Sequence, residues 1–400
     1  MRAPLVAAAL AFALTIGYAA WLQPDWEPQL NDQAQYLALA RGLVERGEFT
    51  RAHDEPFIPE TQRLPGYPLL LVPLCVGGCD HWRIAVAQGA LFAVLVLLVA
   101  SLARRIVPAR ATAAAFAVAL YLPLAYHGAL ALSDLAGAVV FSAGVVAWVR
   151  AVEARSAGWA VAAGALLGWA ALIRASLVLV PLALGAFALA RDRRAAGIAL
   201  ACVAAAALVI APYVAYSERA FARPFGGNGG TVLWIGVFQG RSEADLDDVE
   251  RAAVDDARRD VAAFDAIADR RERALAWPHL DDSLGARARA LIAHDPAGWV
   301  LRAVPRSLEL WAGDVAVRGG GDGTARTLFA VAELVLVAGG VVGALRLLAR
   351  GVPASLVALV IGYVWLTAVP YHTEGRYALP AIPFVVIGAL AALEGRAWKR

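Results

Sequence analysis

Apolar residues form long runs along this chain, and polar residues gather in a few segments between the runs. A membrane span needs about 20 mostly apolar residues, and a tilted or bundle-interior span can be shorter. Ten runs meet this description: residues 3–21, 83–103, 110–127, 129–149, 157–173, 175–190, 195–216, 326–348, 353–371 and 377–394. The pattern predicts an all-α polytopic membrane protein with about ten transmembrane helices.

Two apolar stretches need a separate interpretation. The run that follows Arg2 and reaches Ala19-Ala20 resembles a signal peptide. It is long for that role and many spans follow, so we interpret it as a retained signal anchor. Residues 67–78 (YPLLLVPLCVGG) are too few to span a bilayer. We expect them to be re-entrant or interfacial.

Composition supports a membrane protein and argues against a nucleic-acid partner. Hydrophobic residues make up 60% of the chain and charged residues 17%, and the net charge is only +3. No basic stripe lies on a polar domain, as a nucleic-acid binder would require. The expected surroundings are membrane lipids.

The basic residues indicate how the chain is oriented. In membrane proteins, Lys and Arg are enriched in short cytoplasmic loops. With a cytoplasmic N-terminus, the inside segments hold Arg2, Arg104, Arg105, Arg110, Arg150, Arg155, Arg191, Arg193, Arg194, Arg346, Arg350, Arg396, Lys399 and Arg400. Only Glu153, Asp192 and Glu394 oppose them. The pattern predicts a multi-pass protein of the cell inner (plasma) membrane, with both termini cytoplasmic and the remaining polar groups on the extracytoplasmic face.

This topology divides the chain into three parts. Residues 1–216 form an N-terminal transmembrane module whose first extracytoplasmic loop is 22–82, and residues 326–400 form the C-terminal transmembrane helices. Between them, residues 217–325 form an extracytoplasmic region between spans seven and eight. Its glycine-rich start (FARPFGGNGGTVLWIGV) contains a short strand-like run, and the charge-rich part after it has helical spacing.

Asp32 is the first candidate for chemistry. It lies in NDQAQYLALA, where the apolar spacing predicts a helix that begins near Asn31. A carboxylate in the first turn of a helix is favoured by the helix dipole, so Asp32 can be a simple capping residue. The alternative is a general base at the membrane surface that accepts a proton from an acceptor hydroxyl.

Arg63 and Tyr67 lie in the next motif, RLPGYP, where two prolines and Gly66 predict a rigid turn. The planar guanidinium of Arg63 can bind a phosphate, or it can anchor the loop at lipid headgroups. Tyr67 is a candidate substrate contact.

Arg174 breaks the positive-inside pattern, because it follows the short run GALLGWAALI on the predicted outer side. A charge near the membrane suggests function, with snorkelling to headgroups as the simpler alternative. Asp134, after Ser133 at the outer end of another span, either pairs with an arginine such as Arg174 or shapes the site. The last outer cluster holds His372, Glu374 and Arg376, where Arg376 can hold a phosphate and Glu374 can pair with it; interfacial anchoring is the alternative.

Three cysteines are too few for a disulfide framework. Cys202 lies in an apolar run and is expected in the core. Cys75 and Cys79 flank Val76-Gly77-Gly78, so a local disulfide is plausible in an oxidising compartment. A metal site completed by Asp80 and His81 is the alternative.

The ordered motifs resemble the GT-C polytopic glycosyltransferases, in particular the group of dolichyl-phosphate-mannose–protein mannosyltransferases and lipid A aminoarabinose transferases. The matching pieces follow in order: Asp32 with Tyr36-Leu37-Ala38-Leu39-Ala40, RLPGYP from Arg63, Leu132-Ser133-Asp134, GWAALIR up to Arg174, GTVLWIG from Gly230, and His372 with Glu374, Arg376, Tyr377, Leu379 and Pro380. P-loop, Rossmann, HExxH and GxSxG signals are absent from the sequence.

This resemblance implies an inverting transfer of a sugar from a polyprenyl-phosphate donor to an extracytoplasmic acceptor hydroxyl on a lipid, glycan or protein. Asp32 matches the essential first-loop aspartate, and Arg174 and Arg376 match basic positions near the lipid phosphate. Members often have Asp-Glu where this chain has Asp32-Gln33, and Glu27, Asp54 or Glu55 could supply a second acid. No cofactor and no obligatory metal are expected. A transporter or flippase of a lipid-linked sugar, or a non-catalytic scaffold or polymerase-type relative, remains the alternative.

Overall fold

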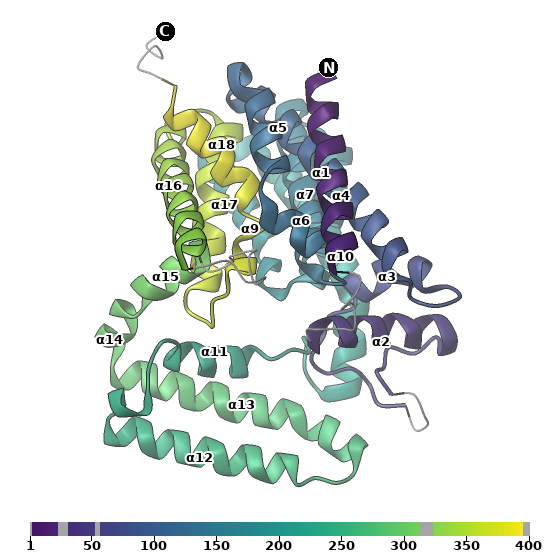
Figure 1. The fold of residues 1–400 in the computed structure, drawn as a ribbon, viewed down its shortest axis with the longest axis vertical. Coiled ribbons are helices and arrows are strands. Elements are labelled where there is room, and N and C mark those ends of the chain that lie inside the picture. Colours follow the sequence, from purple (N-terminus) through teal and green to yellow (C-terminus); the bar gives the residue numbers. More distant parts are fainter. Residues whose placement is uncertain (1, 23–30, 53–56, 313–322, 395–400) are drawn as a thin grey trace.

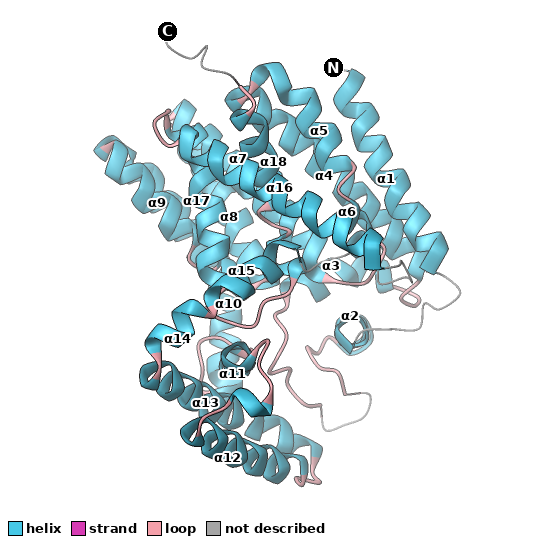
Figure 2. Cartoon of the chain, turned by 60° about the vertical axis from the view of Figure 1, so that its left-hand side comes forward, coloured by secondary structure: helices cyan, strands magenta, loops and turns pink. Residues whose placement is uncertain are grey.

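The computed structural model describes residues 2–22, 31–52, 57–312 and 323–394. Every regular element in these ranges is a helix (Figure 2). The helices form a bundle in which the first helix starts and the last helix ends at the same end (Figure 1). A lobe of further helices lies beyond the other end, with α2 (Asn31–Arg46) beside it. The predicted all-α class is therefore confirmed, and it is the far end of the bundle that receives the polar segments.

Within the described ranges, five helices are long and apolar enough to cross a membrane by themselves: α1 (Arg2–Leu22), α4 (His81–Ile106), α7 (Ser133–Ala154), α10 (Ala196–Phe221) and α16 (Gly323–Leu347). The predicted span 110–127 is broken instead. The segment that ends in α5 (Ala111–Ala119) meets α6 (Leu122–Gly128) at 49°. Pro123 in the first turn of α6 explains the break, since proline disfavours a helical residue before it and lacks an amide donor.

The other predicted spans coincide with shorter apolar helices. These are α8 (Ala157–Ile173), α9 (Val180–Arg191), α17 (Val352–Ala368) and α18 (Ile382–Ala392). Short 3-10 turns precede several bundle helices: Pro108–Arg110 (η2) before α5, Ala175–Leu177 (η3) before α9, Arg193–Ala195 (η4) before α10 and Gly375–Ala378 (η6) before α18. The helices are where the apolar runs predict them, while the total of ten spans stays a prediction.

Small residues let the bundle helices approach closely. A Cβ added to Gly164 of α8 would lie 2.1 Å from the carbonyl oxygen of Cys202 in α10, and one added to Gly343 of α16 would lie 1.7 Å from that of Gly388 in α18. Larger side chains fill the centre, where Trp148 and Phe141 of α7 are fully buried. In lipid there is no hydrophobic driving force between helices, so close van der Waals packing through small residues holds them together.

The lobe consists of α11 (Gly229–Phe238), the turn η5 (Glu243–Asp245), α12 (Asp248–Asp265), α13 (Arg270–His294), α14 (Pro296–Leu301) and α15 (Ala303–Ala312). The strand-like interpretation of TVLWIG was wrong, because α11 is a helix. Gly230 packs so closely on α13 that a Cβ would lie 1.8 Å from the Asp281 carbonyl oxygen. Tertiary contact overrides the β preference of the isolated sequence.

The first polar loop is bounded by α2 (Asn31–Arg46) and α3 (Gly66–Cys75). Cys75 at the end of α3 forms a disulfide with Cys79. The Asp80 carboxylate accepts the Arg83 amide at the start of α4, and a ring nitrogen of His81 lies 3.1 Å from the Ala19 carbonyl oxygen. All four residues of the alternative metal site are thus engaged in other contacts. The division into 1–216, 217–325 and 326–400 stays a prediction, and α10 continues to Phe221.

Candidate active site

Asp32 is positioned by the amphipathic helix α2. The helix begins at Asn31 as predicted, and Tyr36, Leu37 and Ala40 on its buried face pack against α3. Asp32 in the first turn remains about a fifth exposed. Its carboxylate therefore stays at the surface of the bundle while the helix beneath it is held by apolar contacts.

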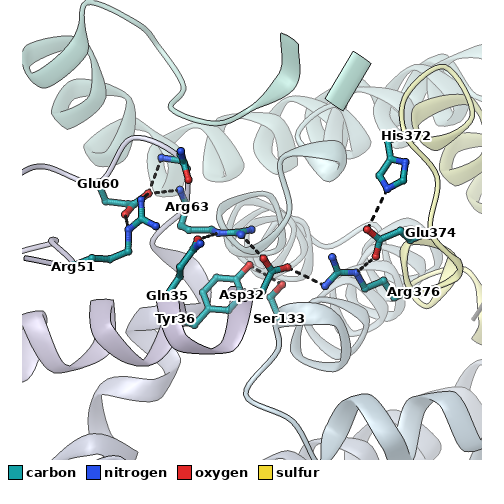
Figure 3. Close-up of polar contacts among 11 residues, drawn as sticks. Asp32, Gln35, Tyr36, Arg51, Glu60, Arg63, Ser133, His372, Glu374 and Arg376 are labelled. Atoms are coloured by element: carbon teal, nitrogen blue, oxygen red, sulfur yellow. Dashed lines mark hydrogen bonds and ion pairs between the residues drawn. The ribbon is translucent and has the colours of Figure 1, made fainter. Parts of the chain in front are cut away.

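Two arginines from distant parts of the chain bind the Asp32 carboxylate. Arg63 Nη2 donates to Oδ1, and Arg376 Nη1 donates to Oδ2 over 3.0 Å. Figure 3 shows Asp32 between the two guanidinium groups. Since each oxygen has a charged donor, Asp32 is more than a helix cap: it joins the first loop to the last polar cluster.

The turn before Arg63 holds this arginine in place. The buried carboxylate of Glu60 accepts the backbone amides of Gln62 and Arg63 over 2.7 and 2.9 Å, and it pairs with Arg51 at 2.5 Å (Figure 3). Arg63 Nε donates to Gln35 Oε1 over 2.7 Å. A buried carboxylate that accepts backbone amides fixes a loop, because unpaired donors would be costly.

Asp134 and Arg174 form a second ion pair. Arg174 Nη1 lies 2.5 Å from Asp134 Oδ1, and His127 Nδ1 lies 4.0 Å from Asp134 Oδ2. Of the two alternatives for Asp134, the pairing with Arg174 is present, and Asp134 also lines the cavity described below. The ring of Tyr377 links both pairs, since its centroid is 5.2 Å from Arg174 Cζ and 5.5 Å from Arg376 Cζ. A cation over an aromatic face is attracted by the ring.

The last cluster continues from Arg376 to His372. Glu374 Oε2 accepts from Arg376 Nε over 2.6 Å, and Glu374 Oε1 lies 3.2 Å from His372 Nε2 (Figure 3). Burial alone would raise the pKa of Glu374, but the hydrogen bond from His372 and the charge and hydrogen bond of Arg376 lower it to about 2. Glu374 is thus an anion in this arrangement.

These groups face a cavity of about 920 Å³. Its charged wall includes Asp32, Arg63, Asp134, Arg174, His372 and Arg376. An apolar wall comes from η3 and α17, with Leu177, Leu179, Val364 and Leu366. Two predicted site residues lie outside the wall. Glu374 is behind Arg376, and Tyr67 is 1% exposed with its ring 5.0 Å from the ring of Tyr36.

Several lining residues were not predicted. Tyr36 and Ser133 hydrogen-bond to each other over 3.1 Å. Arg223 pairs with Asp281 at 3.8 Å, and Asp281 accepts the amides of Gly230 and Thr231 at the start of α11. The glycine-rich segment FARPFGGNGG was the available signal, because a loop of this kind brings backbone close to a ligand or another chain segment.

The acidic groups in the described part of the chain are not clustered as metal ligands would be. No group of three or more His, Cys, Asp or Glu residues in the described ranges could hold a metal ion. Both Asp32 oxygens face arginines instead, a donor set that suits anions. Gln33 gives no second acid. Glu27, Asp54 and Glu55 lie outside the described residues.

A family model described as dolichyl-phosphate-mannose-protein mannosyltransferase matches residues 69–216. This stretch contains Asp134 and Arg174, and it excludes Asp32, Arg63 and Arg376. A search of curated proteins gave no match.

Solved structures of the Archaeoglobus fulgidus oligosaccharyltransferase match nearly the whole chain. The apo form has a TM-score of 0.57 and 16% identity over 97% of this chain and 50% of that one. A complex of this enzyme, AglB, with an inhibitory peptide and a dolichol-phosphate has a TM-score of 0.55 and 18% identity over 97% and 50%. A complex with Zn and sulfate has a TM-score of 0.57 and 18% identity over 98% and 48%. This chain has a GT-C glycosyltransferase fold.

The GT-C fold and the family match over residues 69–216 confirm the resemblance. The chain spans about half the length of the solved structures it matches. The apolar helices and the fold indicate a multi-pass membrane protein, and residues 69–216 are similar to a mannosyltransferase family.

Proposed function

We propose that this protein transfers a sugar from a polyprenyl-phosphate donor to an extracytoplasmic acceptor hydroxyl on a lipid, glycan or protein, with inversion at the anomeric carbon. The observation that carries this proposal is the position of Asp32. It is the only carboxylate of the first loop in the described part of the cavity wall, and two arginines hold it there. One potential base beside several phosphate-binding groups suits this reaction.

The cavity offers a place for each part of such a donor. The guanidinium groups of Arg63, Arg174 and Arg376 provide N–H groups that can hydrogen-bond to the phosphate of the sugar donor. The apolar wall of η3 and α17 suits the first isoprene units. The family match and the dolichol-phosphate complex of AglB support a lipid-phosphate donor. An acceptor peptide is tethered in one AglB structure, which makes a protein acceptor one of three candidates here.

In the proposed reaction, the acceptor hydroxyl loses its proton to Asp32 as its oxygen attacks the anomeric carbon. The bond between this carbon and the phosphate oxygen breaks, and the electron pair leaves with the phosphate. Arginines stabilise the developing negative charge, which favours the transition state over the bound donor. A single displacement inverts the configuration. One Asp32 oxygen must exchange its arginine for the acceptor, and no step uses a metal.

The proposed site faces the extracytoplasmic side of the plasma membrane. The short basic segments include the ends of α4, α7 and α9, which are the helix ends away from the site. The first helix starts and the last helix ends at this same end of the bundle (Figure 1). The positive-inside rule then makes this end cytoplasmic.

A transporter of lipid-linked sugars is the second candidate. Transporters place their binding sites near the bilayer midplane between repeated halves. The ion pairs of this cavity lie instead where the lobe meets the bundle, since Asp32 is on α2 and Arg376 is in η6. This placement favours the transferase.

The test is transfer of radiolabelled sugar from a panel of polyprenyl-phosphate sugars in membranes that contain the full chain. Asp32→Asn should lower the rate at least about 100-fold, because a positioned base typically contributes this much. Asp248→Asn is the matched control, since Asp248 on α12 is almost fully exposed and should leave transfer unchanged. Undiminished transfer by Asp32→Asn would overturn the assigned base.

A further inference from the structure

Gln239 joins the lobe to the last polar cluster. It follows α11, and its side chain meets Thr373 and His372 of the last cluster and Glu309 of α15. Oε1 accepts the Thr373 backbone amide over 2.8 Å and lies 3.2 Å from His372 Nδ1. Nε2 donates to the Thr373 carbonyl oxygen over 2.8 Å and to Glu309 Oε2 over 2.5 Å. One amide thus binds the segment that carries His372.

These partners fix the orientation of the Gln239 amide. The Thr373 amide can only donate, so it must face the Gln239 oxygen. The Thr373 carbonyl oxygen and an ionised Glu309 can only accept, so they must face the Gln239 nitrogen. The atom that faces His372 Nδ1 is therefore an oxygen, and Nδ1 must donate.

The other ring nitrogen of His372 must also donate. Nε2 faces Glu374 Oε1 at 3.2 Å, and Glu374 binds Arg376 through its second oxygen. The ion pair of Glu374 with the Arg376 guanidinium favours the carboxylate form, and a carboxylate can only accept. A histidine whose two nitrogens both donate is an imidazolium.

The surroundings of His372 are mainly uncharged apart from its own segment. Glu374, Arg376 and Tyr377 come from that segment, with the Tyr377 ring 6.5 Å from the imidazole. From α15, Glu309 reaches it only through Gln239. From α11, Val232 accepts the His372 backbone amide over 3.0 Å. From the segment after α11, the uncharged side chain of Gln239 is the one that contacts the imidazole.

The protonation state of His372 decides the net charge of the site. With the imidazolium, the connected ion pairs hold four cations, Arg63, Arg174, Arg376 and His372, against the anions Asp32, Asp134 and Glu374. The lining pair of Arg223 and Asp281 adds one charge of each sign. The excess is one positive charge. With a neutral imidazole the two signs cancel.

We propose that Gln239 is a positioning residue that keeps His372 as an imidazolium, and that this imidazolium supplies the net positive charge by which the site binds an anionic donor. The lobe, through Gln239, then completes the electrostatics of a site whose other charges belong to α2, the following loop, α7, α8 and η6. The inference about donor binding rests on the proposed function, and the protonation state of His372 does not.

The first experiment reads the protonation state without any substrate. The full chain with 15N-labelled histidine is reconstituted in lipid nanodiscs, and the His372 signals are assigned by their loss in His372→Asn. At pH 7.0 we expect two protonated ring nitrogens in the wild type and a neutral ring in Gln239→Leu. The signals of His294, on the far end of α13, should not change. A neutral His372 in the wild type, or an imidazolium in Gln239→Leu, would overturn the proposal.

The second experiment tests donor binding. In Gln239→Leu, loss of one charge should raise the KM for the donor about tenfold at pH 7.0, equivalent to about 1.4 kcal/mol, with kcat nearly unchanged. The exchange Gln239→Glu with Glu309→Gln presents a carboxylate to Nδ1 and should restore a low KM. A loss confined to kcat, or no rescue by the exchange in a folded protein, would contradict the role in donor binding. Absence of transfer by the wild type from every donor would instead contradict the proposed function, and the NMR result would stand.

Discussion

Gln33 lies beside Asp32 on α2, but its side chain points into the protein. It is 2% exposed, and its Oε1 accepts the Ala131 backbone amide over 2.9 Å. A carboxylate at this position would be buried beside an uncharged amide, at a considerable desolvation cost. The amide in place of a second acid therefore connects α2 to the segment before α7.

Replacement of Gln33 by Met should lower stability without removing any group from the cavity. The Ala131 amide would lose its acceptor, and a buried unpaired donor costs about 1–3 kcal/mol. The measurement is the thermal unfolding midpoint in detergent. Gln62→Met is the control, since Gln62 lies in a partly exposed loop where water can replace its contacts. An unchanged midpoint for Gln33→Met would contradict the structural role.

Glu374 should make stability depend on pH in the acid range. Its pKa is about 2 in the folded protein and 4.5 in an ordinary environment. A lowered folded-state pKa gives stability that is present above 4.5 and is lost as the pH falls toward 2. We expect the unfolding midpoint of the wild type to fall across this range more than that of Glu374→Gln.

The control for the acid titration is Glu243→Gln, because Glu243 is an exposed partner of Arg258 on the lobe. Its acid dependence should match the wild type, since exposed ion pairs contribute little. If Glu374→Gln keeps the full acid dependence, the carboxylate is not the group that titrates.

At the scale of elements, α16 and α18 touch through glycines. The added methyl group of Gly343→Ala would overlap the Gly388 carbonyl oxygen and force the helices apart. Overpacking of this kind costs about 1–3 kcal/mol. Thermal unfolding in nanodiscs should show a lower midpoint for Gly343→Ala.

Gly362→Ala is the matched control in α17, because an added Cβ there has no neighbour within 4 Å. Alanine is the better helix former, so this variant should be as stable as the wild type or more stable. Equal losses in both variants would mean that close packing of α16 on α18 is not the cause.

The sequence predicts where the helices lie along the chain better than it predicts which helices pack against each other. Apolar runs and the polar Asn31-Asp32 start define α2 and most bundle helices, because lipid demands long apolar segments. The strand preference of TVLWIG misled because Gly230 and Asp281, which hold α11 as a helix on α13, are 51 residues apart. The local pattern of apolar and polar residues does not indicate a contact between residues so far apart in the sequence.

The candidate site was predicted in part for the same reason. Asp32, Arg63, Arg174 and Arg376 were recognisable as polar groups that the topology places on one side. Their pairing was not, because Arg376 and Asp32 are 344 residues apart. Glu60 and Gln239 were missed, since a carboxylate or an amide in a polar segment has the same appearance whether it is solvated or buried in a network.

For the whole molecule, the orientation is open to a direct measurement. Ser242 lies on the lobe, and Ala154 ends α7 at the opposite end of the bundle. In intact cells, a membrane-impermeant maleimide should label Ser242→Cys and should not label Ala154→Cys. The native cysteines give a low background, because Cys202 is buried and the other two form a disulfide. Labelling of Ala154→Cys alone would reverse the proposed orientation.

The double ion pair of Asp32 has a kinetic consequence. The arginines that would hold a phosphate are the same groups that occupy the oxygens of the proposed base. The carboxylate is then an internal competitor for the donor, and donor arrival would release it. Such an exchange predicts compulsory order, with donor first and acceptor second.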